Sequence, residues 1–285
     1  MAASKHPVLR TVWWSADLLL KLAIVTLLYS GAWEFSVQQY LRGFSNAIVP
    51  AAATPEQKVE SILDWLRAGP ARSQSPPPEG LAQRDPETTL NDQELLRVCG
   101  TATNAFVNLA RSSGLAARRL LLLSPDGGAK HVVAEVKIEG RWAIVDPTYR
   151  AILHDAQGRV LTREDLRDPE TFREATRVIP GYPPEYSYES SAHIRLARLS
   201  LVGLGLRRFL NAVYPRWDDE VDLTLLVERE SMAMLAASIA LVISLLLLRI
   251  LLVRYADRQW SFTLSRRYLR LFGSSPNPFT QSALN

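Results

Sequence analysis

The amino-acid sequence predicts an α+β protein, in which a helix packs on an antiparallel sheet and a transmembrane helix flanks this core on either side. Two observations support this fold class. Long apolar runs lie near both ends of the 285-residue chain, and between them a helical pattern is followed by three short strand patterns. The overall composition of 47% hydrophobic and 22% charged residues is ordinary for a globular domain, so the order of the patterns carries the prediction.

The first apolar run, residues 13–33, is long enough to cross a bilayer as a helix. Asp17 and Lys21 interrupt it at i,i+4 spacing, which lets their side chains pair on one helix face. A cleaved signal peptide is the alternative, since residues 30–32 (Ser-Gly-Ala) resemble a cleavage site. The internal charges and the length of the run favour an uncleaved anchor.

The second apolar run, residues 231–253, is the clearer span, because Arg249 is its only charged residue. The aliphatic stem of Arg249 lets its guanidinium extend toward the lipid headgroups. Acidic residues precede this run and arginines lie at its end and beyond. The acidic residues are Asp218, Asp219, Glu220, Asp222, Glu228 and Glu230, and the arginines are Arg249, Arg254, Arg258, Arg266, Arg267 and Arg270.

The charge difference between these flanks predicts the orientation of the chain. Under the positive-inside rule the basic tail 254–285 is cytoplasmic, and two spans return residues 1–12, with Lys5 and Arg10, to the same side. Residues 34–230 then form an extracytoplasmic, periplasmic region. We therefore expect a protein of the inner or plasma membrane with both termini in the cytoplasm.

Charge and cysteine content exclude two classes of function. The net charge is only +4 and the basic residues crowd into particular segments, so nucleic-acid binding is not expected. Cys99 is the only cysteine, which excludes an internal disulfide and a multi-cysteine zinc centre. We expect no metal and no cofactor.

The extracytoplasmic region begins with an amphipathic helix from Pro55 to about Ala68, with Thr54 as its N-cap. A loop or mobile flap rich in proline, serine and arginine follows at residues 69–86. The remaining elements are a helix at 102–112 and strands at 119–123, 131–136 and 141–145.

After Thr148 the strand pattern is lost. A short helix is expected near residues 164–166, and a loop rich in proline and tyrosine at residues 179–188. Residues 193–213 form either a helix packed on the domain, which we favour, or a helix on the membrane surface. His154 and His193 are interpreted as strand-surface residues.

A thiol, an imidazole and a carboxylate follow one another at the edges of these elements. Cys99 lies where the helix before the strands begins, so exposed N–H groups and the helix dipole can lower its pKa. His131 opens the second strand and Asp146 ends the third. This order suits a nucleophilic site in which Asp146 orients His131 and His131 deprotonates Cys99.

The hairpin between the last two strands allows two registers. A loop of four residues puts His131 directly opposite Asp146. A loop of two residues, Glu139-Gly140, pairs Ile138 with Arg141 and makes Asp146 a diagonal neighbour of His131. In either register the carboxylate can reach the imidazole.

The same stretch resembles the transglutaminase-like superfamily. The features that it shares are Cys99-Gly100 heading a helix, Gly-Leu-Ala-Ala-Arg at 114–118, His131 with Glu135, Trp142, and Asp146-Pro147-Thr148. The resemblance implies a papain-like core at about residues 55–150, with Cys99 as nucleophile, His131 as general base and Asp146 as orienting acid. Val133 departs from the family pattern, in which many members have a tryptophan, so an aromatic side chain lining a substrate tunnel is not expected there.

Two further residues are assigned beside the predicted triad. Gln93 lies six residues before Cys99, a spacing similar to that of the oxyanion glutamine of the papain family, although an exposed polar residue is the simpler interpretation. The Cys99 N–H is a second oxyanion donor. Trp142 is interpreted as a packing residue that supports the site.

Together these observations predict a bacterial-type, membrane-anchored thiol enzyme that acts on an amide or peptide through a thioester acyl-enzyme. Either water or an amine resolves this intermediate, which gives a peptidase, an amidase or an acyltransferase. The alternative is a non-catalytic scaffold that keeps the fold to bind an envelope ligand. The expected partners are a protein or peptide substrate in the cell envelope, the lipid bilayer and membrane proteins that contact the spans.

Overall fold

A computed structural model describes the chain in two compact units. We call them the terminal unit, which comprises Met1–Trp33 and Met234–Asn285, and the central unit, Glu34–Ala233. The residues described are 7–68, 72–73, 85–125, 127–194, 200–215, 217, 223, 225–226 and 229–260.

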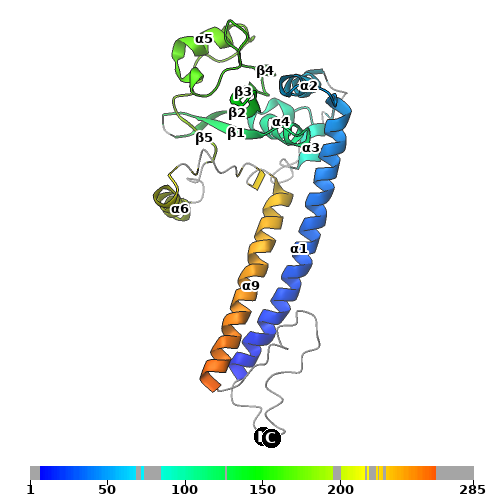
Figure 1. Ribbon diagram of the computed structural model, residues 1–285, viewed down its shortest axis with the longest axis vertical. Coiled ribbons are helices and arrows are strands. Elements are labelled where there is room, and N and C mark those ends of the chain that lie inside the picture. Colours follow the sequence, from blue (N-terminus) through cyan, green and yellow to red (C-terminus); the bar gives the residue numbers. More distant parts are fainter. Residues whose placement is uncertain are drawn as a thin grey trace. The chain divides into compact units, whose positions relative to one another are not determined.

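Two long helices, α1 (Pro7–Ile48) and α9 (Glu230–Trp260), supply the terminal unit with their residues up to Trp33 and from Met234 onward. Segments Thr11–Ile48 and Glu230–Tyr255 are long and apolar enough to cross a membrane, in agreement with the two predicted spans. Figure 1 shows the two helices side by side, and buried Leu20 and Ala23 pack there against Leu245. Helix α1 continues past the predicted run because no proline interrupts the sequence before Pro50.

A polar contact joins the two helices inside the terminal unit. Asp17 forms an ion pair with Lys21 Nζ at 2.8 Å and accepts a hydrogen bond from Arg249 Nη1 at 2.7 Å. The predicted pairing of Asp17 with Lys21 is therefore confirmed. Arg249 does not extend away from the helix pair as expected, because Asp17 and the ring of Trp13, 4.9 Å from its guanidinium carbon, hold it in a position that is only 7% exposed.

The central unit is built on an antiparallel sheet with strand order β4-β3-β2-β1-β5. Its strands are β1 (Ala117–Leu123), β2 (Ala129–Ile138), β3 (Arg141–Asp146), β4 (Ala151–Ile152) and β5 (Ser191–Ala192). Helices α2 (Pro55–Ala68), α3 (Pro86–Asn91) and α4 (Cys99–Ser112) precede the sheet, with the short 3-10 helix η2 (Leu95–Arg97) before α4. Figure 1 shows α4 against the sheet, so the predicted α+β fold with a helix on an antiparallel sheet is confirmed.

The two faces of the sheet are covered by different parts of the chain. Ala134 and Val136 of β2 are fully buried and belong to the face on which α4 packs, where Thr103 Oγ1 donates to Val132 O at 3.0 Å. Residues that alternate with these belong to the opposite face and pack under the segment that follows β3. This second cluster includes Leu120, Leu122, Val133, Ile144, Leu153, Leu161, Leu166, Phe172, Tyr182 and Tyr188.

The β2–β3 hairpin has the two-residue loop. Ile138 pairs with Arg141, and Glu139 and Gly140 have φ values of 49° and 82°. Positive φ at both loop residues matches the right-handed twist of the flanking strands. The four-residue alternative is therefore wrong, and Asp146 is a diagonal neighbour of His131.

Helix α2 begins where the sequence predicts. Thr54 N donates to Gln57 Oε1 at 2.9 Å, and Gln57 N donates to Thr54 Oγ1 at 3.3 Å, which forms a reciprocal capping box. Lys58 Nζ donates to the carbonyl of Ser113 at 2.9 Å and so links α2 to the end of α4.

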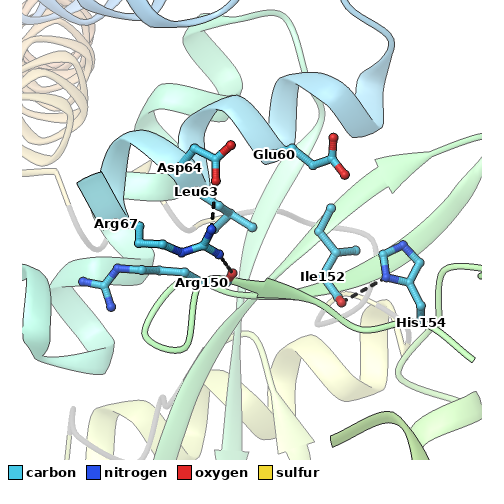
Figure 2. A pocket seen from close by; sticks show the side chains of 7 residues that line it. All are labelled: Glu60, Leu63, Asp64, Arg67, Arg150, Ile152 and His154. Atoms are coloured by element: carbon cyan, nitrogen blue, oxygen red, sulfur yellow. Dashed lines mark hydrogen bonds and ion pairs between the residues drawn. The ribbon is translucent and has the colours of Figure 1, made fainter. Parts of the chain in front are cut away.

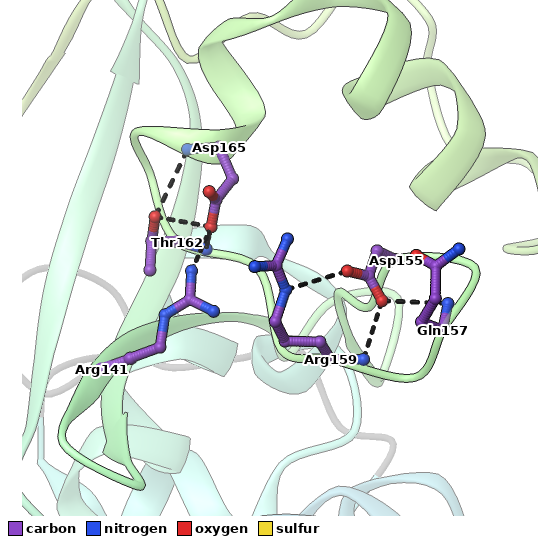
Figure 3. A network of polar contacts seen from close by, with 6 residues as sticks. All are labelled: Arg141, Asp155, Gln157, Arg159, Thr162 and Asp165. Atoms are coloured by element: carbon purple, nitrogen blue, oxygen red, sulfur yellow. Dashed lines mark hydrogen bonds and ion pairs between the residues drawn. The ribbon is translucent and has the colours of Figure 1, made fainter.

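The chain after β3 is more regular than expected. The predicted short helix is the 3-10 helix η3 (Asp165–Arg167), and it is followed by α5 (Pro169–Arg177), which was not predicted. Asp165 fastens this segment to the sheet, since it accepts from Arg141 Nη2 at 2.6 Å and from Thr162 N at 2.9 Å (Figure 3). Nearby, Arg159 Nε donates to Asp155 at 3.0 Å and closes the preceding turn (Figure 3).

A buried polar cluster joins the two ends of the central unit to α4. Glu34 Oε1 accepts from Arg229 Nη1 at 2.7 Å, and Glu34 Oε2 accepts from Ser231 Oγ at 2.6 Å. Arg229 Nη2 donates to Asn108 Oδ1 at 2.5 Å. Glu34 and Arg229 are 3% and 4% exposed, so the charges neutralise each other inside the unit.

Helix α6 (Ser200–Val213) occupies part of the stretch for which a helix was expected. Several predictions concern residues outside those described. These are residues 1–6 with Lys5, residues 69–71 and 74–84 of the proline-rich loop, residues 195–199 of the expected helix, the acidic residues at 218–222 and 228, and the tail from 261 onward.

Candidate active site

Cys99 is the first residue of α4. Its N-cap, Val98, makes no side-chain capping bond, so the first backbone N–H groups of this helix are left without a capping acceptor. The thiol is half-buried at this positive end of the helix. The sequence placed Cys99 at a helix start, and the structure agrees.

His131 and Asp146 form a buried pair. His131 Nε2 lies 2.7 Å from Asp146 Oδ2, and the two side chains are 2% and 0% exposed. Asp146 Oδ1 accepts from the backbone N–H groups of Thr148 at 3.0 Å and Tyr149 at 3.2 Å. The carboxylate is thus held from both oxygens, and Nδ1 is the ring nitrogen left for the Cys99 thiol.

Protonation of the thiol and the imidazole is coupled. A hydrogen bond with His131 lowers the pKa of Cys99, the backbone N–H groups of Val132 and Gly100 add to this, and burial opposes it. Burial alone would lower the pKa of His131, but its hydrogen bonds with Asp146 and Cys99 outweigh burial and raise that pKa to about 9. The arrangement favours a thiolate–imidazolium pair near neutral pH.

Tyrosines enclose the imidazole, and the sequence analysis assigned them no role. The ring of Tyr186 stacks on His131 with 4.3 Å between centroids and 10° between planes. Tyr149 lies with its ring centroid 6.0 Å from that of His131 and 4.7 Å from that of Tyr182. Burial is the main cause that raises the pKa of Tyr186 to about 12, so this phenol stays neutral. The tyrosine-rich composition of residues 179–188 was the feature of the sequence that could have indicated this role.

Residues 42–147 match the family model described as the transglutaminase-like superfamily. The chain carries a transglutaminase-like domain. The match covers the end of α1, helices α2 to α4 and strands β1 to β3, and it includes Cys99, His131 and Asp146. No curated protein and no solved structure matches the chain.

A second histidine–carboxylate contact lies on the same face of the sheet. Glu135 Oε2 accepts from Arg118 Nε at 2.6 Å and lies 2.8 Å from His193 Nε2. Burial would raise the pKa of Glu135, but hydrogen bonding with His193 and the charge of Arg118 outweigh it and lower the pKa. His193 is 6% exposed, so its interpretation as a strand-surface residue is wrong.

Trp142 belongs to this second cluster. The guanidinium carbon of Arg118 lies 4.2 Å from the centroid of its ring, which is a cation–π contact. Trp142 and Asp146 alternate onto one face of β3, and Trp142 lies at the opposite end of the strand. Trp142 therefore packs against the cluster of Glu135 and Arg118.

Gln93 and His154 have other partners. Gln93 Oε1 accepts from Arg72 Nη1 at 3.4 Å, and Gln93 N donates to the carbonyl of Ser73. The described contacts of Gln93 do not include Cys99. His154 is half-buried and lies with Nε2 2.8 Å from Glu56 Oε1.

Proposed function

We propose that the transglutaminase-like domain is a thiol enzyme in which Cys99 attacks an amide, His131 is the general acid and base, and Asp146 orients His131. The observation that carries the proposal is the buried contact of 2.7 Å between His131 and Asp146, with the Cys99 thiol at a helix start on the other side of the ring. A thiol with a lowered pKa, a base beside it and a third group orienting the base form the general arrangement of an activated nucleophile.

The reaction would proceed in two balanced steps. The Cys99 thiolate forms a C–S bond to the amide carbonyl carbon, and the tetrahedral oxyanion collapses as the C–N bond breaks. His131 gives its Nδ1 proton to the departing amine, which leaves a thioester. His131 then takes a proton from water or from a primary amine as that nucleophile attacks the thioester, and the thiolate is released.

The oxyanion of both steps needs donors close to Cys99. The backbone N–H of Cys99 suits this role, because it begins α4 and has no capping side chain. Gln93 stays a prediction for the second donor, and it would have to leave the contact with Arg72 to serve.

The two apolar helices and the charges beside them support a proposal for the location of the substrate. We propose that residues 34–230 face the periplasm or cell exterior, that both termini are cytoplasmic, and that the substrate is a protein or peptide of the cell envelope. This proposal is supported by arginines after the second span and acidic residues before it. Cysteine-scanning with a membrane-impermeant maleimide in a Cys99→Ala background, at position 139 against position 5, tests the sidedness.

The activity is tested with the full chain in detergent micelles. A glutamine-containing protein and a labelled primary amine are supplied together, and amine incorporation is compared with release of the free acid. Cys99→Ala should abolish both, because it removes the nucleophile. Full activity in Cys99→Ala protein would overturn the proposal.

A second measurement does not depend on the substrate. Since the chain has one cysteine, the rate at which iodoacetamide modifies the protein reports on Cys99 alone. We expect modification at pH 6 to be at least tenfold faster than that of a model thiol. A rate no faster than the model thiol, with no titration near neutral pH, would favour a non-catalytic envelope-binding domain.

A further inference from the structure

Two half-buried arginines near the predicted triad have no acidic partner among the described residues. Arg150 Nη1 donates to the carbonyl of Thr148 at 2.9 Å, and Arg72 Nη2 donates to the carbonyl of Trp65 at 2.9 Å. The Nε atoms of both arginines are buried and have no hydrogen-bond partner. Arg72 has further contacts, since its Nη1 donates to Gln93 Oε1 at 3.4 Å and its guanidinium carbon lies 4.3 Å from the centroid of the Trp65 ring. Arg150 therefore contributes most of the unused donors and of the positive charge without an anionic partner.

Further arginines surround Arg150. Arg67 Nη2 donates to the carbonyl of Arg150 at 3.0 Å, and Arg97 is two residues before Cys99. Burial lowers the pKa of Arg150, and the charges of Arg67 and Arg97 lower it further. We call Arg67, Arg72, Arg97 and Arg150 the arginine cluster. Its members repel one another, so a negatively charged ligand would be attracted to them.

The acids that partner two members of the arginine cluster are exposed. Arg67 pairs with Asp64 at 3.0 Å, with side-chain exposures of 58% and 69%, and Arg97 pairs with Glu94 at 2.8 Å, with exposures of 63% and 48%. Such surface pairs contribute little and exchange readily with other partners. A ligand can therefore compete for Arg67 and Arg97 as well as occupy Arg150.

A pocket of about 390 Å³ opens beside the arginine cluster, between α2 and β4. Figure 2 shows Arg67 and Arg150 at one end of it, together with Asp64, the ion-pair partner of Arg67, and Leu63 and Ile152 as its apolar walls. Glu60 and Asp64 also line the pocket from α2. This lining suits a ligand with one carboxylate at the arginine end and an aliphatic stem, rather than a polyanion.

The pocket is close to the site of the proposed reaction. Arg150 directly follows Tyr149, whose ring centroid lies 6.0 Å from that of His131. Tyr149 N also donates to Asp146 at 3.2 Å. The turn that holds the Asp146 carboxylate thus carries Arg150 into the pocket wall.

We infer that the arginine cluster binds a carboxylate of the peptide substrate, with the side chain of an acidic residue in the pocket beside the amide that Cys99 attacks. A guanidinium matches a carboxylate through two parallel N–H···O bonds, which a neutral amide cannot reproduce. The inference rests on the proposed function and adds the substrate class, an acidic peptide.

The first test compares two reagents of similar size, iodoacetate and iodoacetamide, on the full chain in detergent micelles. The ratio of their rates with Cys99 reports the local positive field. Arg150→Gln should lower that ratio about fivefold, since one nearby positive charge is removed. Arg97→Gln, an exposed position at which folding is not at risk, should lower it about threefold.

Arg173→Gln provides the matched control. Arg173 is exposed on α5, donates to the carbonyl of Pro169 and is outside the arginine cluster, so the ratio should not change. Far-UV circular dichroism verifies that each variant is folded. An iodoacetate-to-iodoacetamide ratio that is the same in wild type, Arg150→Gln and Arg97→Gln overturns the inference.

The second test uses peptidyl chloromethyl ketones that differ only in glutamate against glutamine at successive positions from the reactive group. Wild type should be inactivated about tenfold faster by one glutamate compound, and Arg150→Gln should remove the preference. A reactive Cys99 without this preference overturns the inference and leaves the proposed function intact. A Cys99 that reacts with none of the reagents faster than a model thiol overturns the proposed function itself.

Inorganic phosphate separates a peptide site from a general anion site. If a peptide carboxylate is the ligand, phosphate should protect Cys99 from the glutamate compound much less than an acetylated glutamyl peptide amide does. Equal protection by phosphate and peptide would overturn the assignment to a carboxylate.

Discussion

Two buried histidine–carboxylate pairs lie on one face of the sheet, and they differ in the third group that each contacts. His131 and Asp146 are 2.7 Å apart and face the thiol of Cys99. His193 and Glu135 are 2.8 Å apart, and the carboxylate oxygen that they share also accepts from Arg118. The first pair therefore contacts a nucleophilic thiol, whereas the carboxylate of the second pair is neutralised by the guanidinium of Arg118.

The comparison shows that a histidine–carboxylate contact alone does not identify a catalytic site. Both pairs use Nε2, both are almost fully buried, and both involve strand β2. Arg118 has its own aromatic partner in Trp142, and Nε2 of His193 contacts the carboxylate of Glu135. We therefore treat the cluster of Arg118, Glu135 and His193 as structural, and five substitutions with one control test this division.

The largest expected effect is on stability. Glu135→Ala should lower the free energy of unfolding by about 3–5 kcal/mol, because it leaves Arg118 buried without its anion. The Cys99 alkylation rate of the folded fraction should be unchanged. Chemical denaturation and iodoacetamide kinetics measure the two quantities.

The control for this prediction is a more exposed ion pair. Arg141 and Asp165 have side-chain exposures of 34% and 28%, so Arg141→Gln should cost less than about 1 kcal/mol. If Glu135→Ala slowed alkylation of Cys99 in the folded protein, the two pairs would be one functional unit.

The next effect is on reactivity. Asp146→Asn should slow alkylation of Cys99 at pH 6 by about 10- to 100-fold, because the imidazolium loses the anion that stabilises it and the thiolate loses its counterion. Asparagine keeps the oxygen that accepts from the backbone of Thr148 and Tyr149, so the turn should remain folded. Unchanged kinetics in Asp146→Asn would contradict the assigned orienting role.

The contributions of His131 and Glu135 to the stability of the protein should change in opposite directions as the pH rises. The pKa of His131 is raised to about 9 from 6.5, so its stabilising contribution is complete below about pH 6.5 and is lost as pH rises to about 9. The lowered pKa of Cys99 has the opposite effect, since its contribution is lost as pH falls through that pKa. A thiolate–imidazolium pair binds as many protons as a thiol and a neutral imidazole, so the two contributions offset each other.

Removing the Cys99 thiol should reveal how the stability of the protein depends on the protonation of His131 alone. Cys99→Ala removes the part of the His131 shift that Cys99 causes, which leaves Asp146 as the group that raises this pKa. The melting temperature of the variant should then fall as pH rises above about 6.5, whereas the wild type should be flat there. Glu135, with its lowered pKa, should instead cause a loss of stability only as pH falls below about 4.5. Thermal melts over pH 4–9 measure both, and parallel profiles for wild type and Cys99→Ala would contradict the ion pair.

The smallest effects concern the aromatic ring beside each pair. Tyr186→Leu removes the ring stacked on His131 and should cost about 0.5–1.5 kcal/mol, with a change in the pH profile of Cys99 alkylation. Trp142→Leu removes the cation–π contact of Arg118 and should cost about 0.5–1 kcal/mol, with that profile unchanged. If Trp142→Leu changed the pH profile of Cys99 alkylation and Tyr186→Leu did not, the division between the two pairs would be contradicted.

Local patterns were sufficient to predict the elements that carry Cys99, His131 and Asp146. Helix α4 and strands β1 to β3 follow one another with short connections. The spacing of their hydrophobic residues and the turn residues between them therefore indicate these elements directly. Register was the exception, since Glu139-Gly140 is compatible with a loop of two or four residues. The positive φ of Glu139, unusual for a residue other than glycine, decides it in the folded chain.

The surroundings of the triad could not be predicted in the same way. His193 contacts Glu135 across 58 residues of sequence, and Tyr186 reaches His131 from a loop. Strands β4 and β5 have two residues each, which is too short for any periodic pattern. These contacts depend on how the chain after β3 folds back on the sheet, and a single sequence does not encode that path locally.

The ion pair between Glu34 and Arg229 has a practical consequence for work on this molecule. It fastens together the first and last parts of the central unit, and Asn108 of the helix that begins with Cys99 is joined to the same pair. A fragment cut at residues 34 and 233 would therefore keep the ion pair that joins its two ends. The contacts of Glu34 with Arg229 and Ser231, and of Arg229 with Asn108, all lie within residues 34–233. This fragment is therefore our choice for a reagent without most of the two apolar helices.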